Sequence, residues 1–122
     1  MKKSQFTESN SSDVPKKPGL YEIYRNDGTP LKVGISKNLR RRLMSNHRLS
    51  STYNSTLACH MKRDKTLAPE YNLAKKSKRR EFLENECYIL WEVIEDEEEL
   101  RRREKELEAT GKFRYTGEWK GR

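Results

Sequence analysis

The hydrophobic and polar positions near the start of the chain predict two neighbouring strands. Residues 19–25 form a short segment rich in Leu, Tyr and Ile, and residues 31–36 alternate strictly between apolar and polar side chains. Such segments are typical of strands, and strict alternation indicates one buried face. The intervening sequence, Asn-Asp-Gly-Thr-Pro, favours a tight turn. The pattern therefore predicts a β-hairpin in this part of the chain.

A helix and a buried strand are predicted further along. Ser36 can cap a helix in which Leu39, Leu43 and Asn46 share one stripe. Residues 86–94 form a nearly continuous apolar run, which is typical of a central strand buried on both faces. We expect this strand to lie at the hydrophobic centre of the fold.

A last helix is predicted to begin after Asp96, which can cap it. Its buried stripe runs through Leu100 and Leu107, and the helical period places Glu104 between them on the same side. This carboxylate is either a functional group facing the core side or the partner of a neighbouring arginine at the rim. The solvent side of the helix is expected to hold Glu106 and Glu108.

Composition limits the fold to one small domain. The chain has 122 residues, of which 32% are hydrophobic, well below the roughly 45 to 50% of ordinary globular proteins. Residues 1–17 show no hydrophobic period and are expected to form a disordered basic tail. Residues 18–122 are expected to form an α+β domain, with a three-stranded, mainly antiparallel sheet flanked by helices. Within it, residues 49–80 are interpreted as a variable basic insertion, in which residues 56–63 can form a short helix.

Several classes of protein are excluded. No apolar run approaches the roughly 18 to 20 residues of a membrane span, and no signal-peptide core follows Met1. We expect a soluble, cytoplasmic protein with no membrane partner. Cys59 and Cys87 are too few and too far apart for a disulfide scaffold and are expected to be buried, reduced thiols. Adjacent Cys59 and His60 do not suit a closed zinc site, which needs four ligands.

The charge points to a polyanionic partner. The formal net charge is +8, and the cations concentrate before residue 86, whereas acidic residues outnumber basic ones after it. Clusters of Lys and Arg suit phosphate neutralisation, although such runs are also common on solvated surfaces. The cations nearest the predicted hairpin and helix are Lys37, Arg40, Arg41 and Arg42.

The predicted hairpin register brings reactive groups together. With the turn near Gly28, Tyr21 pairs with Gly34 and Ile23 pairs with Lys32, so Tyr21 and Lys32 are diagonal neighbours about 7 to 8 Å apart. A glycine opposite Tyr21 leaves space over its phenol. A phenol, two cations and a carboxylate form a chemically coherent set for phosphodiester hydrolysis.

These residues, in this order, resemble the GIY-YIG nuclease family. Gly19 and Tyr21 match the first strand motif, Gly34 matches the second, and the arginine-bearing helix follows, with a looser similarity over residues 91–107. The resemblance implies that Tyr21 is the general base, that Arg42 stabilises the transition state and that Glu104 binds one Mg²⁺ or Mn²⁺ ion. Lys32 stands where the second motif usually has tyrosine, as in restriction-type members.

The resemblance implies a metal-dependent endonuclease that acts on nucleic acid, with double-stranded DNA expected, and that forms a homodimer if it cuts both strands. A standalone restriction-type or mobile-element nuclease is the nearest parallel. The alternatives are an inactive nucleic-acid-binding module of the same fold and a basic domain that binds another partner. His47 is either a phosphate contact or an exposed helix-end residue. The candidate substrate-binding residues are Gly19, Gly34, Lys37, Arg40, Arg41 and His47. The segment Gly117-Glu118-Trp119 is similar to that closing some divergent relatives.

Overall fold

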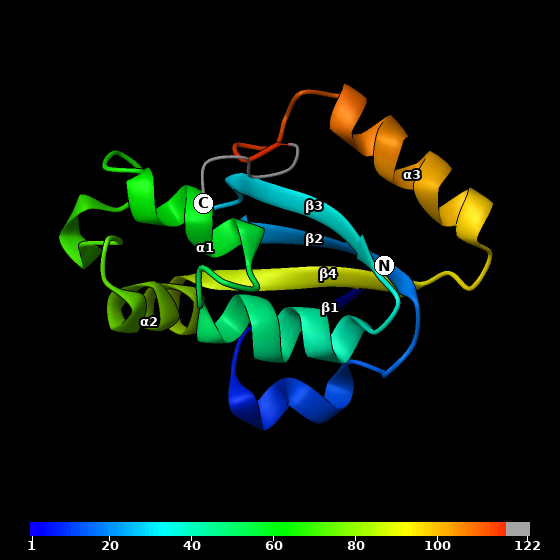
Figure 1. The fold of residues 1–122 in the computed structure, drawn as a ribbon, viewed down its shortest axis with the longest axis horizontal. Helices are drawn as coiled ribbons and strands as arrows, with labels where there is room; N and C mark the ends of the chain where they lie inside the picture. Colours follow the sequence, from blue (N-terminus) through cyan, green and yellow to red (C-terminus); the bar gives the residue numbers. More distant parts are fainter. Residues whose placement is uncertain (117–122) are drawn as a thin grey trace.

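The chain forms an α+β fold around one four-stranded antiparallel sheet, which confirms the predicted fold class (Figure 1). The computed structural model describes residues 1–116, so the Gly117-Glu118-Trp119 segment lies outside the described residues. The strand order is β1-β4-β2-β3, where the strands are β1 (Lys2–Gln5), β2 (Gly19–Arg25), β3 (Pro30–Ser36) and β4 (Cys87–Val93). The prediction of three strands is wrong because β1 adds a fourth.

The first residues are ordered, which corrects the expected disordered tail. β1 pairs antiparallel with β4, and a 3-10 helix, η1 (Glu8–Asp13), follows it. Phe6 and Val14 are fully buried, and the indole N–H of Trp91 donates to Ser4 Oγ at 3.2 Å. Phe6 and Val14 are isolated apolar residues, so they give no periodic signal in the sequence. Both side chains nevertheless enter the core that packs against the sheet. The folded part of the chain therefore begins before residue 18.

The hairpin of β2 and β3 has the predicted register. Tyr21 pairs with Gly34, and Ile23 pairs with Lys32. Gly28 adopts a φ of 94°, and Thr29 donates its backbone N–H to Asp27 Oδ1 at 2.9 Å, which closes the turn. β4 lies between β1 and β2 and is almost completely paired, which agrees with the predicted central strand.

The helix after β3 spans residues 39–49, and its middle, η2 (Arg41–His47), is π-helical. Ser36 does not cap it directly. Ser36 Oγ accepts the N–H of Asn38 at 3.0 Å, and Asn38 Oδ1 accepts the N–H of Arg41 at 3.1 Å. The capping residue is therefore Asn38.

The predicted insertion is largely helical. It contains α1 (Thr56–Arg63), as predicted, a short 3-10 helix η3 (Pro69–Tyr71), and the start of α2 (Lys76–Glu86), which leads directly into β4. The buried guanidinium of Arg79 on α2 donates to Ser50 O at 2.8 Å, and Arg48 pairs with Glu84 at 3.1 Å. These bonds join α2 to the 39–49 helix. In Figure 1 the 39–49 helix runs along β4, and α2 lies at the beginning of that strand.

The last helix, α3 (Glu97–Ala109), lies apart from the other helices, beyond β3 (Figure 1). Asp96 Oδ1 accepts the N–H of Glu98 at 3.0 Å, so it is the predicted cap. Glu97 and Arg101, four residues apart on this helix, form an ion pair at 2.9 Å. Across residues 1–116, none of the helices is both long enough and apolar enough to span a membrane.

Each face of the sheet carries its own core. On one face, Tyr21, Ile89 and Trp91 pack against the 39–49 helix, α1 and α2, and on the other, Leu20 and Val33 pack against α3. Both cysteines are buried free thiols, as predicted. The predicted catalytic groups of β2 and β3 lie on the first face, at the side nearer α3.

Candidate active site

The Tyr21 phenol is buried directly over Gly34, as the register predicted. Only 1% of Tyr21 is exposed, and a Cβ on Gly34 would collide with the phenol oxygen and ring. The absence of a side chain at Gly34 is therefore what makes room for the phenol. Gly34 is a packing position and is not open to a substrate, which corrects its expected role.

His47 is fully buried and contacts the phenol, so it matches neither expected alternative, a phosphate contact or an exposed helix-end residue. Its Nε2 lies 2.8 Å from Tyr21 Oη, and its Nδ1 lies 2.7 Å from Ser55 Oγ. Burial lowers the pKa of His47 well below its ordinary value, and the charges of Lys32 and Arg42 lower it further. The imidazole is neutral at physiological pH.

Arg42 is the cation that acts most directly on the phenol. Burial raises the pKa of Tyr21 above its ordinary range, whereas Arg42 lowers that pKa through its charge and a hydrogen bond. The carboxylate of Glu104 raises it again. Three of the predicted catalytic residues therefore meet, and the balance of their charges determines how readily the phenol ionises.

Lys32 is the fourth member of this group. It is 7% exposed, and its burial lowers the pKa of the amine, which Arg42 lowers further. The carboxylates of Glu104 and Glu108 act in the opposite direction and raise it. Lys32 is thus a buried cation that faces the acidic side of α3.

Glu104 is half-buried on α3 and faces Lys32, which agrees with the predicted helix register. Burial raises the pKa of Glu104, Glu108 raises it further, and Lys32 and Arg101 lower it. Glu108 is half-buried on the same side, so the expectation that it faces solvent is wrong. Glu106 is exposed and pairs with Arg102 at 2.7 Å, as expected of the solvent side.

These carboxylates are the groups that could hold a metal ion. Within residues 1–116, no cluster of three or more His, Cys, Asp or Glu could enclose one. Glu104 and Glu108, spaced one helical turn apart, offer hard oxygen ligands that suit a divalent ion completing its shell with water and substrate oxygens. The carboxylate oxygens of Glu104 and Glu108 therefore suit one hydrated hard cation.

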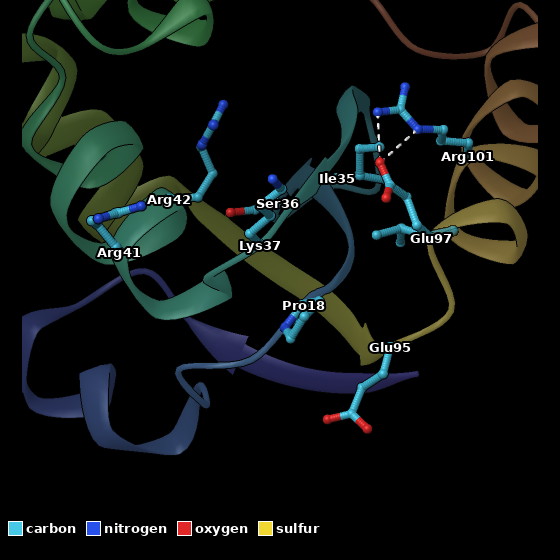
Figure 2. A pocket seen from close by; sticks show the side chains of 10 residues that line it. Pro18, Ile35, Ser36, Lys37, Arg41, Arg42, Glu95, Glu97 and Arg101 are labelled. Atoms are coloured by element: carbon cyan, nitrogen blue, oxygen red, sulfur yellow. Dashed lines mark hydrogen bonds and ion pairs between the residues drawn. The ribbon is translucent and has the colours of Figure 1, made fainter.

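A pocket of about 510 Å³ adjoins this group, between the 39–49 helix and the start of α3 (Figure 2). Arg41 and Arg42 line it from the helix, and the paired Glu97 and Arg101 line it from α3. Lys37 lies between them at the end of β3. Lys37 and Arg41 are exposed, and their role in binding a substrate stays a prediction.

Two other expected substrate contacts have structural roles. Arg40 donates through Nε to Val14 O at 2.7 Å and through Nη2 to Ser12 O at 3.4 Å. It therefore attaches the N-terminal segment to the helix. Gly19 is buried, and a Cβ there would collide with the Glu92 carbonyl and the Leu39 side chain. Both expectations are corrected because long-range packing uses these residues.

The roles of His47, Glu108 and Ser55 at this site were not predicted from the sequence. His47 follows Leu43 by four residues and Glu108 follows Glu104 by four, so the helical period could have placed both on the functional sides of their helices. Ser55 gave no such signal, because its contact with His47 depends on how the insertion folds back.

Comparisons with known proteins agree with the fold. No protein-family model matches this sequence. Over 45 residues, the chain is 40% identical to the UvrABC system protein C of two strains of Bacteroides fragilis; the match covers 37% of this chain and 7% of that protein.

Two solved structures share the architecture. Both are point mutants of the GIY-YIG N-terminal endonuclease domain of UvrC from Thermotoga maritima, bound to its catalytic divalent cation. One is 21% identical with a TM-score of 0.53, and the match covers 89% of this chain and 93% of that domain. The other is 20% identical with a TM-score of 0.52, and the match covers 89% and 92%. The chain therefore has the fold of the GIY-YIG superfamily, as the motifs of its first hairpin indicated.

Proposed function

We propose that this chain is a metal-dependent endonuclease that hydrolyses phosphodiester bonds, with double-stranded DNA as its substrate. The observation that carries the proposal is the phenol of Tyr21, buried over Gly34, on which the charges of Arg42 and Glu104 both act from two other elements. The shared fold with a nuclease domain that binds a catalytic divalent cation supports it.

Each residue then has a defined chemical role. Tyr21, as phenolate, accepts a proton from the attacking water, whose oxygen forms a bond to phosphorus while the bond to the leaving oxygen breaks. Arg42 stabilises the negative charge that develops on the phosphate and favours the ionised phenol. Lys32 adds a second buried cation beside Glu104.

Glu104 would hold one Mg²⁺ or Mn²⁺ ion, with Glu108 beside it. A bound divalent ion would supply positive charge next to the scissile phosphate. Because so few protein ligands are offered, we expect weak ion binding until a phosphate oxygen joins the site. Lys37 and Arg41 would contact neighbouring phosphates from the adjoining pocket. Cutting both strands would require two copies of the site, hence a homodimer, or two successive events.

One observation favours a second candidate, a nucleic-acid-binding module that does not cut. Burial raises the pKa of Tyr21, and a phenol that stays protonated cannot act as a base. Binding without cleavage would follow if Arg42 and the metal did not offset this effect.

The test is to incubate the full chain with supercoiled plasmid or with RNA, in Mg²⁺, Mn²⁺ or EDTA. We expect nicked plasmid with either metal and none with EDTA. Tyr21→Phe and Glu104→Gln should abolish cleavage, and Glu104→Gln should bind DNA at least as tightly, because a negative charge near phosphate is removed.

Glu106→Gln is the matched control on the same helix, because Glu106 is exposed and its ion pair within residues 1–116 is with Arg102. It should cleave at the parental rate. Cleavage by Tyr21→Phe at that rate would exclude the phenol from the mechanism. Binding without cleavage in every metal would favour the inactive module, and cleavage of RNA alone would reassign the substrate.

A further inference from the structure

A continuous chain of buried hydrogen bonds connects the predicted insertion to the Tyr21 phenol. Ala58 donates its backbone N–H to Ser55 Oγ at 3.0 Å, because Ser55 caps α1. Ser55 Oγ lies 2.7 Å from His47 Nδ1, and His47 Nε2 lies 2.8 Å from Tyr21 Oη. Each group therefore contacts the next, from the start of α1 to the candidate active site.

The direction of these bonds depends on which imidazole nitrogen carries the proton. A neutral imidazole donates from one nitrogen and accepts at the other. The Ser55 hydroxyl either donates to His47 Nδ1 or accepts from it. In the first case Nε2–H donates to the phenol oxygen of Tyr21, and in the second the phenol donates its own proton to Nε2.

The hydroxyl hydrogens of Ser55 and Tyr21 distinguish the two directions. Both side chains are buried, as is His47 between them. Among the described residues, the acceptor within reach of the Ser55 hydroxyl hydrogen is His47 Nδ1. A buried hydroxyl left without an acceptor is costly. The phenol carries no hydrogen in the ionised form that the proposed function requires, so the first direction leaves neither hydroxyl hydrogen without an acceptor.

We propose that Ser55 is a positioning residue that fixes His47 as the Nε2–H tautomer, so that His47 donates a hydrogen bond to the Tyr21 oxygen and favours its ionised form. The inference deepens the proposed nuclease function and rests on it for its role in cleavage. Aligned donors polarise one another, so the chain from the Ala58 N–H adds positive potential at the phenol oxygen. The insertion then contributes to the chemistry as well as to the fold.

Charged groups from three neighbouring elements act on the Tyr21–His47 pair. They are Lys32 on β3, Arg42 on the same helix as His47, and Glu104 on α3. All of these remain in a Ser55 variant. A change in pH dependence on replacing Ser55 would therefore report on the hydrogen-bond chain.

The first test is independent of activity. Two-bond proton–nitrogen NMR correlations on the full chain distinguish the two neutral tautomers, and His60→Gln assigns the two histidines. We expect His47 to be protonated at Nε2 in the parent and in Ser55→Thr, and the Nδ1–H form to appear in Ser55→Ala. Asp96→Ala, which removes the cap of α3 instead, should leave the His47 signals unchanged. An Nδ1–H tautomer in the parent protein would overturn the inference, whether or not Ser55→Ala folds.

The second test is the pH profile of plasmid nicking. Ser55→Ala should move the rising limb to higher pH by about one unit, equivalent to roughly tenfold slower cleavage below the limb, and Ser55→Thr should restore it. An unchanged limb together with unchanged His47 signals in Ser55→Ala would also reject the role of Ser55. If His47 has the expected tautomer but neither the parent nor any variant nicks plasmid, the hydrogen-bond chain is supported and the proposed nuclease function is rejected.

Discussion

At the scale of single residues, Tyr21 is held by contacts that have opposite effects on its ionisation. Burial over Gly34 fixes the phenol but raises its pKa, and Glu104 adds to this increase. Arg42 acts in the opposite direction. Functional groups with strongly shifted pKa values are common at catalytic sites, where rigid placement and reactivity have to be balanced.

Arg40 and Arg41 are neighbours in sequence and differ in their contacts. Arg40→Ala should lower the free energy of unfolding by about 1 to 2 kcal/mol, because the Val14 and Ser12 carbonyls lose their donor, and should leave DNA affinity nearly unchanged. Arg41→Ala should leave stability unchanged and reduce the salt slope of DNA binding by about 1. Urea unfolding and binding titrations at several salt concentrations measure both. Weaker DNA binding by Arg40→Ala at full stability would contradict this assignment.

At the scale of elements, the π-helical turn of η2 determines which side chains reach the phenol. In an α-helix, Arg42 and His47 would lie about 140° apart around the axis. The wider π turn, with bonds five residues apart, brings residues at this spacing to the same side. His47 then bonds to Tyr21, and Arg42 acts on the same phenol. Such turns are frequent at functional sites.

Close packing between β2 and β3 gives a prediction for Gly34→Ala. The added Cβ would collide with the Tyr21 phenol, so we expect a loss of about 1 to 3 kcal/mol in stability together with loss of cleavage. Gly111→Ala is the control, because its φ of 68° costs stability while nothing lies near its Cβ. It should be destabilised but still cleave. Thermal unfolding and nicking assays compare the two, and full activity in Gly34→Ala would show that the phenol position is not critical.

At the scale of the whole molecule, segments distant in sequence close the fold around the sheet. The segment after α3 bonds to the edge of β3, where Tyr115 donates its backbone N–H to Leu31 O at 2.8 Å. Asp64, just after α1, accepts from Arg114 Nε at 2.6 Å and from the Tyr115 hydroxyl at 2.7 Å. The insertion and the C-terminal segment are therefore fastened to one another.

Two ionisable side chains, His47 and Asp64, are expected to make the free energy of unfolding depend on pH. Burial lowers the pKa of His47 below its ordinary 6.5, so below about pH 6.5 the unfolded chain binds a proton that the folded chain does not, and stability falls as pH falls. The hydrogen bond from Arg114 lowers the pKa of Asp64 below its ordinary 3.8, so the stability that Asp64 contributes is present above that pH and is lost below it.

Urea unfolding from pH 8 to pH 3 tests both groups. The parent should lose up to about 1.4 kcal/mol per pH unit from His47 below pH 6.5, and His47→Gln should remove this part of the slope. Asp64→Asn should flatten the profile below about pH 4 and reduce stability at neutral pH by about 1 to 3 kcal/mol. An unchanged slope near pH 6 in His47→Gln would show that another group titrates there.

Features that depend on neighbouring residues could be predicted from the sequence. The hairpin follows from strict alternation and turn chemistry, and its register places Tyr21 opposite Gly34. The cap at Asp96 and the side of α3 that holds Glu104 follow from helical period. These are local patterns, in which each residue's position is set by others a few places away.

Features that depend on distant contacts could not be predicted from the sequence and are visible in the folded chain. β1 forms because β4 offers it an edge and Phe6 fills the core, which no pattern within residues 1–17 reveals. His47 is buried because the insertion folds back and places Ser55 against it. Arg40 holds the N-terminal segment because that segment returns beside the helix. In each case the free energy comes from contacts between residues far apart in the chain, which a single sequence does not pair.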